Sequence, residues 1–168
     1  EKEQKEWIKA AYIGVSNEEL KGKIKSFLKP ESDEEAKPTF EELQNEIANS
    51  IEDSKLNDED KNKIWNFCLL DESTNKSYGN SIFSAKRRAI IGKDQGKKIW
   101  VDDVLNIKED SGEVAFIPQC TKNVFMKYYN ASTNNLQGWD KEDAEAYKAN
   151  IEHVLKEFLV KTENNEEQ

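Results

Sequence analysis

Apolar residues at helical spacing occupy both ends of this chain, and this pattern restricts its fold more than any other feature of the sequence. Side chains three and four residues apart lie on one face of an α-helix, so each such stripe predicts a helix with one buried side. Capping boxes at residues 16–19 and 39–42 mark the expected starts of two helices. The predicted inward residues of the three N-terminal stripes are Trp7, Ile8, Ala11, Tyr12 and Val15, then Leu20, Ile24, Phe27 and Leu28, then Phe40, Leu43, Ile47 and Ile51.

The last third of the chain predicts one further long helix. Residues 140–143 form a polar cap, whose acidic side chains suit the positive end of a helix dipole. The stripe that follows is expected to be buried, and it consists of Ala144, Tyr147, Ile151, Val154, Leu155, Phe158 and Leu159. The polar residues 161–168 then predict a frayed tail.

Short apolar runs in the middle of the chain predict a small β component. We interpret residues 67–70 as a buried strand, because the run is short and polar residues bound it. Residues 116–118 predict an edge strand that ends at its proline, and residues 93–116 predict a loop with one or two short strands. The polar residues 71–80 predict a loop. The expected fold class is therefore mainly α with a small β component.

The length of 168 residues suits one compact domain with a substantial core. Within it we expect a helical lead-in over residues 1–55 and a C-terminal domain over residues 56–160, followed by the tail. No apolar run approaches the roughly 20 residues that a membrane span needs, so we expect a soluble protein. Cys68 and Cys120 lie in apolar stretches without metal or disulfide spacing, which favours buried free thiols in a reducing compartment.

Charge is distributed unevenly along the chain, and the middle differs from both ends. The net charge of -9 would by itself argue against nucleic acid, because phosphates repel an acidic surface. Residues 1–60 hold 9 Lys and 17 acids, for -8, and residues 99–168 hold 7 Lys and 14 acids, for -7. Residues 61–98, here called the basic segment, hold 9 Lys or Arg and 3 acids, for +6. The basic segment is therefore the part that could bind DNA.

Two asparagines, Asn66 and Asn75, lie in the basic segment within a longer pattern. The pattern reads Ile64-x-Asn66-x-x-Leu69-Leu70, then Asn75-Lys-Ser77, Asn80, Phe83 and Lys86-Arg87. It resembles, position by position, the C-terminal nuclease domain of GmrSD-type modification-dependent restriction enzymes and their anti-phage relatives, which are His-Asn-His (ββα-metal) nucleases. Residues 116–129 and 139–159 resemble the same family, so the resemblance covers roughly residues 56–160.

The resemblance implies a helical domain around a partial ββα-metal motif, in a bacterial protein that cuts foreign DNA with Mg²⁺ or Mn²⁺. It also implies a larger cytoplasmic parent protein, whose N-terminal domain resembles a ParB-like nucleotidase. Asn75 would ligate the metal through its amide oxygen, and Asn66 would support a catalytic histidine. The side chains that would contact DNA phosphates are Lys76, Lys86, Arg87, Arg88 and Lys93.

The chain departs from this family in its first strand, which should supply an acidic residue and a histidine that activates water. No histidine precedes Asn66, because the only one in the chain is His153. Residues 93–113 also resemble an insertion. We therefore expect the chain alone to be inactive as a nuclease. Without its first strand, residues 67–70 should have an exposed edge, which predicts a disordered loop or pairing with another segment.

A second interpretation of the same residues needs no catalysis. Asparagines in polar loops are more often turn formers than metal ligands, and lysines and arginines at helical spacing often form a solvated face. The chain would then be a non-catalytic helical module that binds DNA or a partner domain through the basic segment. The sequence leaves both interpretations open.

Overall fold

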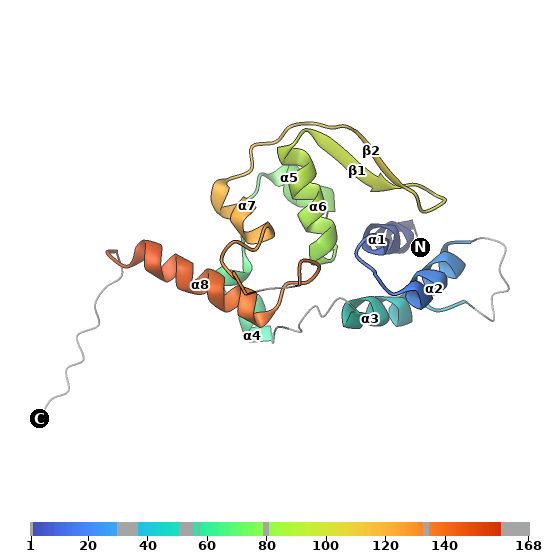
Figure 1. Cartoon of the computed structure of the whole chain (residues 1–168), viewed down its shortest axis with the longest axis horizontal. Helices are drawn as coiled ribbons and strands as arrows, with labels where there is room; N and C mark the ends of the chain where they lie inside the picture. Colours follow the sequence, from blue (N-terminus) through green and yellow to red (C-terminus); the bar gives the residue numbers. More distant parts are fainter. Residues whose placement is uncertain are drawn as a thin grey trace, which may run out of the picture.

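The computed structural model describes residues 2–29, 37–50, 56, 58–78, 81–132 and 135–158. This part of the chain is mainly helical, with one two-stranded antiparallel sheet (Figure 1). The coarse fold class expected from the sequence is therefore confirmed. No helix among the described residues is long and apolar enough to cross a membrane. The predicted tail, residues 161–168, lies outside the described residues.

Helices α1 (Lys2–Tyr12), α2 (Glu18–Leu28) and α3 (Phe40–Ser50) pack together as the N-terminal unit (Figure 1). Their apolar stripes face one another as predicted, and the buried residues that they share are Ile8, Ala11, Leu20, Ile24, Leu43 and Ile47, with Val15 from the turn after α1. Ile51 lies outside the described residues. On the rim of this core, the Trp7 and Phe40 rings meet edge to face, 5.7 Å apart.

One predicted capping box of the N-terminal unit is confirmed, and the other is wrong by one residue. Thr39 N donates to Glu42 Oε2 at 2.8 Å, and Glu42 N donates to Thr39 Oγ1 at 3.2 Å, so both halves of this box form. Helix α2 is instead capped by Asn17, whose Oδ1 accepts from Glu19 N at 2.9 Å and Leu20 N at 3.1 Å. Because the Asn17 amide satisfies two free N–H groups, it replaces Ser16 as the cap.

The C-terminal half contains α4 (Asp58–Lys61), the 3-10 helix η2 (Ile64–Asn66), α5 (Glu72–Tyr78), α6 (Phe83–Asp94), α7 (Gln119–Phe125) and α8 (Lys141–Leu155). A second core lies among these elements, built on Phe83, Ile90, Ile117 and Phe125, with Cys68, Leu70, Ala115 and Trp139 packed against it. The Phe83 ring lies 5.5 Å from Phe125 and 5.6 Å from Trp139. Helix α6 therefore forms the centre of this half.

Helix α6 also joins the two halves of the molecule (Figure 1). Ile82 and Ala85 pack into the core of the N-terminal unit. From the same helix, Arg88 Nη2 donates to Ala10 O, near the end of α1, at 3.0 Å. Residues 82–94 thus contribute side chains to both cores.

Residues 67–70 do not form the buried strand that the sequence predicts. Phe67 is extended, at φ -119° and ψ 152°, but residues 67–70 pair with no strand among the described residues. Phe67 and Leu69 are exposed. Neither alternative predicted for its edge is seen in the described part of the chain, where the segment has a defined position and no strand partner. It is held instead by Cys68 and Leu70, which pack against the second core.

Residues 72–78 form helix α5 where the sequence predicts a loop. The Asp71 side chain caps this helix, since its Oδ1 accepts from Thr74 N at 2.9 Å and from Ser73 Oγ at 2.7 Å. Asp and Ser are favoured at helix starts as well as in turns, so composition alone does not distinguish the two. Residues 116–118 are likewise not a strand: Ile117 is buried, and Pro118 leads directly into α7.

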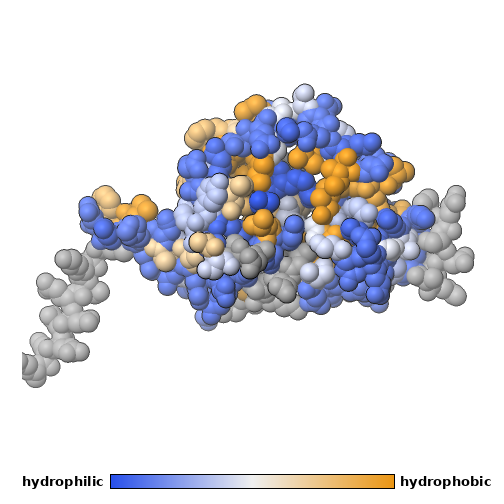
Figure 2. All heavy atoms as spheres, in the orientation of Figure 1, coloured by the Kyte–Doolittle hydropathy of each residue, from blue (hydrophilic) through white to orange (hydrophobic). Residues whose placement is uncertain are grey.

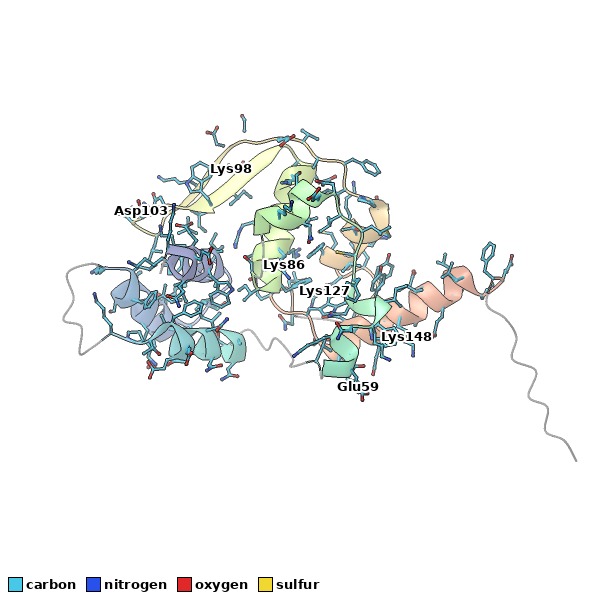
Figure 3. The ribbon with its side chains drawn as sticks, turned by 180° about the vertical axis from the view of Figure 1, so that it is seen from behind. Glu59, Lys86, Lys98, Asp103, Lys127 and Lys148 are labelled. Atoms are coloured by element: carbon cyan, nitrogen blue, oxygen red, sulfur yellow. The ribbon has the colours of Figure 1, made fainter. Side chains whose placement is uncertain are left out.

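The sheet is a hairpin of β1 (Lys97–Val101) and β2 (Ile107–Ser111), which confirms short strands within residues 93–116. Its register pairs Lys97 with Ser111 and Val101 with Ile107. The tip, where Leu105 has a φ of 63°, reaches α1 through an ion pair between Lys9 Nζ and Asp103 Oδ1 at 2.6 Å. Figure 3 shows Asp103 at this tip and Lys98 on the hairpin.

Helix α8 begins with the predicted polar cap but does not bury its whole apolar stripe. Asp140 and Asp143 form a complete capping box, and Ala144 is buried. Val154, Leu155 and Phe158 are exposed, contrary to the prediction, because the end of α8 projects away from the body of the molecule (Figure 2). Leu159 lies outside the described residues.

Candidate functional site

Asn66, the residue predicted to support a catalytic histidine, hydrogen-bonds to the end of the preceding helix α4. Its Nδ2 donates to Lys61 O at 2.9 Å, at the end of α4, where the last carbonyls of a helix accept from groups outside the helix. Its Oδ1 accepts no hydrogen bond from the described residues. Beside it, the Trp65 ring lies 4.9 Å from Lys148 Nζ of α8. The 3-10 helix η2, which carries Asn66, therefore contacts both α4 and α8.

Asn75, the predicted metal ligand, lies on α5 with an exposed side chain. The helix is positioned by its opposite side, where Thr74 is buried and its Oγ1 accepts from Lys93 Nζ of α6 at 3.1 Å. At the helix start, hydrogen bonds from the Thr74 hydroxyl, the Ser73 hydroxyl and the Thr74 N–H hold the pKa of Asp71 well below its usual range. Asp71 is therefore ionised, and its side chain caps the start of α5.

The described residues do not by themselves make a metal site around Asn75. No group of three or more His, Cys, Asp or Glu side chains in the described part of the chain could hold an ion. The carboxylates nearest to it in sequence are both engaged, Asp71 as the cap of α5 and Glu72 in an ion pair with Lys76. Mg²⁺ accepts few protein ligands but prefers carboxylate oxygens among them. A further carboxylate from another segment would therefore suit a metal site at Asn75.

Three of the five predicted DNA-binding side chains hold α6 against its neighbours. Arg87 Nε donates to Phe125 O at 2.8 Å, at the end of α7, and Arg88 donates to α1 as described above. Lys93 donates to Thr74 on α5. Cationic side chains suit the carbonyl ends of helices, where the dipole is negative. Burial also lowers the pKa of Arg88. Phosphate would have to compete with these contacts.

The remaining two predicted DNA-binding side chains differ from each other. Lys76 is exposed on α5 and pairs with Glu72 one helical turn earlier. Lys86 is half-buried on α6, near the centre of the molecule (Figure 3). Its positive charge lowers the pKa of the Cys68 thiol, although burial has the larger effect and raises that pKa overall. Cys68 is a half-buried free thiol. Cys120 is exposed, contrary to its prediction as a buried residue.

Residues 67–70, here called the unpaired segment, lie between the two asparagines. Cys68 and Leu70 face the second core, while Phe67 and Leu69 face outward with 57% and 70% of their surface exposed. Leu69 O accepts from Thr121 Oγ1 of α7 at 2.6 Å. Among the described residues, no backbone carbonyl accepts a hydrogen bond from the N–H groups of Cys68, Leu69 and Leu70. The segment therefore alternates outward and inward side chains as a strand does, without a strand partner among the described residues.

A buried polar cluster that the sequence does not predict lies where α7 ends and α8 begins. Lys127 Nζ lies 2.5 Å from Asp143 Oδ2, and Asn130 Nδ2 donates to Asp143 Oδ1 at 3.0 Å. The ammonium also lies 5.5 Å from the centre of the Phe83 ring of α6. The only sequence signal was Asp143 in the predicted cap, since Lys127 follows α7 with no special spacing. This cluster fixes α8 against the second core.

No family model, curated protein or solved structure matches this chain. The His-Asn-His interpretation therefore depends on the residues quoted above and on the geometry around them.

Proposed function

We propose that this chain is the C-terminal part of a metal-dependent DNA endonuclease of the His-Asn-His class, and that it requires one more strand to hydrolyse DNA. The observation on which this proposal depends is the unpaired segment, which begins directly after Asn66 and ends just before the helix of Asn75. Its side chains alternate, and among the described residues no backbone carbonyl accepts from Cys68, Leu69 or Leu70 N, so a neighbouring strand would fit there. The strand with the acidic residue and the histidine would pair there.

The position of Asn66 supports this assignment. A strand paired with the unpaired segment would pass next to Asn66, whose amide already donates to Lys61 O. The amide oxygen can accept a hydrogen bond from one N–H of an imidazole, which would orient the ring and leave its other nitrogen basic. Asn66 would then act as a positioning residue for the general base. The acidic residue of the same strand would supply a carboxylate ligand to the metal beside the amide oxygen of Asn75.

DNA binding in this proposal depends mainly on Lys76 and Lys86. The pair between Lys76 and Glu72 is exposed, and exposed ion pairs contribute only about 0–1 kcal/mol, so a phosphate can displace it. Arg87 and Arg88 have structural partners, and we expect them to position α6. Lys76→Ala should therefore weaken DNA binding for all sequences and reduce the salt slope of binding by about one counterion.

The decisive experiment compares plasmid nicking by this chain with nicking by a version extended upstream through its gene, in Mg²⁺ or Mn²⁺. We expect only the extended protein to nick DNA, and Asn75→Ala and Asn66→Ala to abolish or greatly reduce nicking. Asn45→Ala is a matched control, because Asn45 is an exposed asparagine on α3. Full activity of the extended Asn75→Ala variant would refute the proposal.

The second candidate is a non-catalytic module that binds DNA or a partner domain. It is favoured by the internal contacts of Arg87 and Arg88 and by the exposed apolar side chains of Phe67 and Leu69. This candidate predicts that an extended protein binds its partner but leaves the plasmid intact in either metal. Loss of DNA affinity in Lys76→Ala, without any nicking by the extended protein, would support DNA binding alone.

A further inference from the structure

The outer strand of the hairpin, β2, pairs only with β1 among the described residues, so its other edge is free there. All five of its residues are exposed, whereas Ile99 and Val101 of β1 are half-buried and β1 packs against α6 and α1. Figure 1 shows the hairpin at the rim of the molecule, with β2 along its outer side. A free strand edge presents unpaired N–H and C=O groups that can pair with another strand.

The hydrogen bonds that flank the hairpin identify which backbone groups face this edge. Asp102 N donates to Asn106 O at 3.0 Å, and Gly112 N donates to Gly96 O at 2.8 Å. Bonded and non-bonded pairs alternate in an antiparallel ladder, so the bonded pairs within the register are 98 with 110 and 100 with 108. The remaining residues of β2 direct their backbone groups outward, and these are Ile107, Glu109 and Ser111.

We propose that β2 pairs with β2 of a second copy of this chain, antiparallel and centred on Glu109, to form a continuous four-stranded sheet. In this register Lys108 lies opposite Asp110 of the second copy, twice per dimer because the interface is isologous. Each of the three central registers places two like charges at the axis, those of Lys108, Glu109 or Asp110. Only centring on Glu109 also forms two pairs of opposite charge. The order of charges along β2 therefore selects one register.

The backbone and the side chains agree on this register. The N–H and C=O groups of Ile107, Glu109 and Ser111 face outward. Glu109 would therefore form two backbone hydrogen bonds with Glu109 of the second copy, and Ile107 would form two with Ser111 of the second copy. The two Glu109 side chains at the axis are each neutralised by Lys97, whose Nζ lies 2.6 Å from Glu109 Oε1. Charged edges usually discourage pairing, but alternating signs permit it in one arrangement.

Two existing contacts must be given up on pairing. Ser111 N donates to Asp110 Oδ1 at 2.7 Å, and Lys108 Nζ lies 3.6 Å from Asp102 Oδ2. The first contact is exposed, and the second joins an exposed lysine to a half-buried aspartate at a long distance, so both are weak. The association should therefore be weak, and the dimer should form at high protein concentration.

The first test is the mass of the full chain in solution, measured by sedimentation velocity over a concentration series up to millimolar. We expect the mass to rise from 19.4 kDa toward twice that value. Glu109→Pro should abolish this rise while circular dichroism stays unchanged, because the N–H of residue 109 faces outward and is not part of the hairpin ladder. A wild-type chain that stays monomeric, or a Glu109→Pro chain that still dimerises, would overturn the proposal.

The second test exchanges charges to check the register. Lys108→Glu and Asp110→Lys should each weaken self-association roughly tenfold, because two attractive pairs become repulsive. Mixing the two variants should restore dimers, since every facing pair is again of opposite sign. Glu145→Lys on α8 is the control for net charge, and it should dimerise like the wild type. Failure of the mixture to associate would contradict this register and with it the proposal.

Discussion

Lys127 Nζ and Asp143 Oδ2 lie 2.5 Å apart, and neither side chain has access to solvent. Asp143 Oδ2 also accepts from Asp140 N at 3.1 Å, and Asn130 donates to its other oxygen, so each oxygen of the buried carboxylate has protein partners. A buried charge is tolerated when it is paired and hydrogen-bonded. The pair joins the turn after α7 to the first turn of α8.

Asp143→Ala should destabilise the protein strongly, because it leaves the Lys127 ammonium buried without its partner. Breaking such a pair typically costs about 3–5 kcal/mol in the free energy of unfolding. Urea denaturation measures this directly. Glu145→Ala, which removes an exposed carboxylate of the same helix, should change stability by less than about 0.5 kcal/mol. Equal effects of the two substitutions would contradict the role assigned to the pair.

Arg88→Met should lower stability by about 1–3 kcal/mol, because Ala10 O loses its donor and the contact between α6 and α1 weakens. Methionine keeps much of the apolar volume of the side chain, so the loss reports mainly on the hydrogen bond. Thermal unfolding of the two proteins provides the measurement. An unchanged melting temperature would show that Arg88 is free for another role.

Leu69 and Leu70 are neighbours in the unpaired segment, but substitutions there should have different effects. Leu70→Ala should destabilise this chain by about 2 kcal/mol, because Leu70 packs against the second core. Leu69→Thr should leave its stability nearly unchanged, because Leu69 is exposed. In the upstream-extended protein, Leu69→Thr should reduce stability if a strand covers this edge. No difference there would argue that the edge stays open.

Asp71 should make stability depend on pH in the acid range. Its pKa is lowered in the folded state by hydrogen bonds from Thr74 and Ser73, so the ionised form stabilises the fold. That contribution is present above the ordinary aspartate pKa of about 3.9 and is lost as the pH falls through the lower folded value. Asp71→Asn keeps a capping side chain without the charge, so its urea midpoint should fall less than that of the wild type below about pH 4. Parallel pH curves would contradict this role.

Helices with regular apolar spacing and explicit caps could be predicted from the sequence. The stripe of Leu43 and Ile47 and the box of Thr39 and Glu42 depend on residues within one or two helical turns, so the local sequence contains what they need. The hairpin was predicted only as short strands within a loop. Helix α5 was missed because Asp71 and Ser73 suit a turn as well as a cap.

The candidate site was predicted in part, because its residues could be named but not their surroundings. The roles of Asn66 and Asn75 stay predictions. Lys76 is on the surface as expected, whereas Arg87 and Arg88 donate to carbonyls of α7 and α1. The charge of a side chain can be read from the sequence, but its partner comes from segments distant along the chain.

The sequence by itself determined where the helices with regular apolar stripes form, the charge of each segment and the order of Lys108 and Asp110 along β2, because these are local properties of the chain. Only the tertiary structure decided that, in the described part of the chain, residues 67–70 have no strand partner and β2 pairs on one side alone, and that Lys127 is buried against Asp143. Strand pairing and burial depend on contacts between distant segments. Local spacing does not specify those contacts.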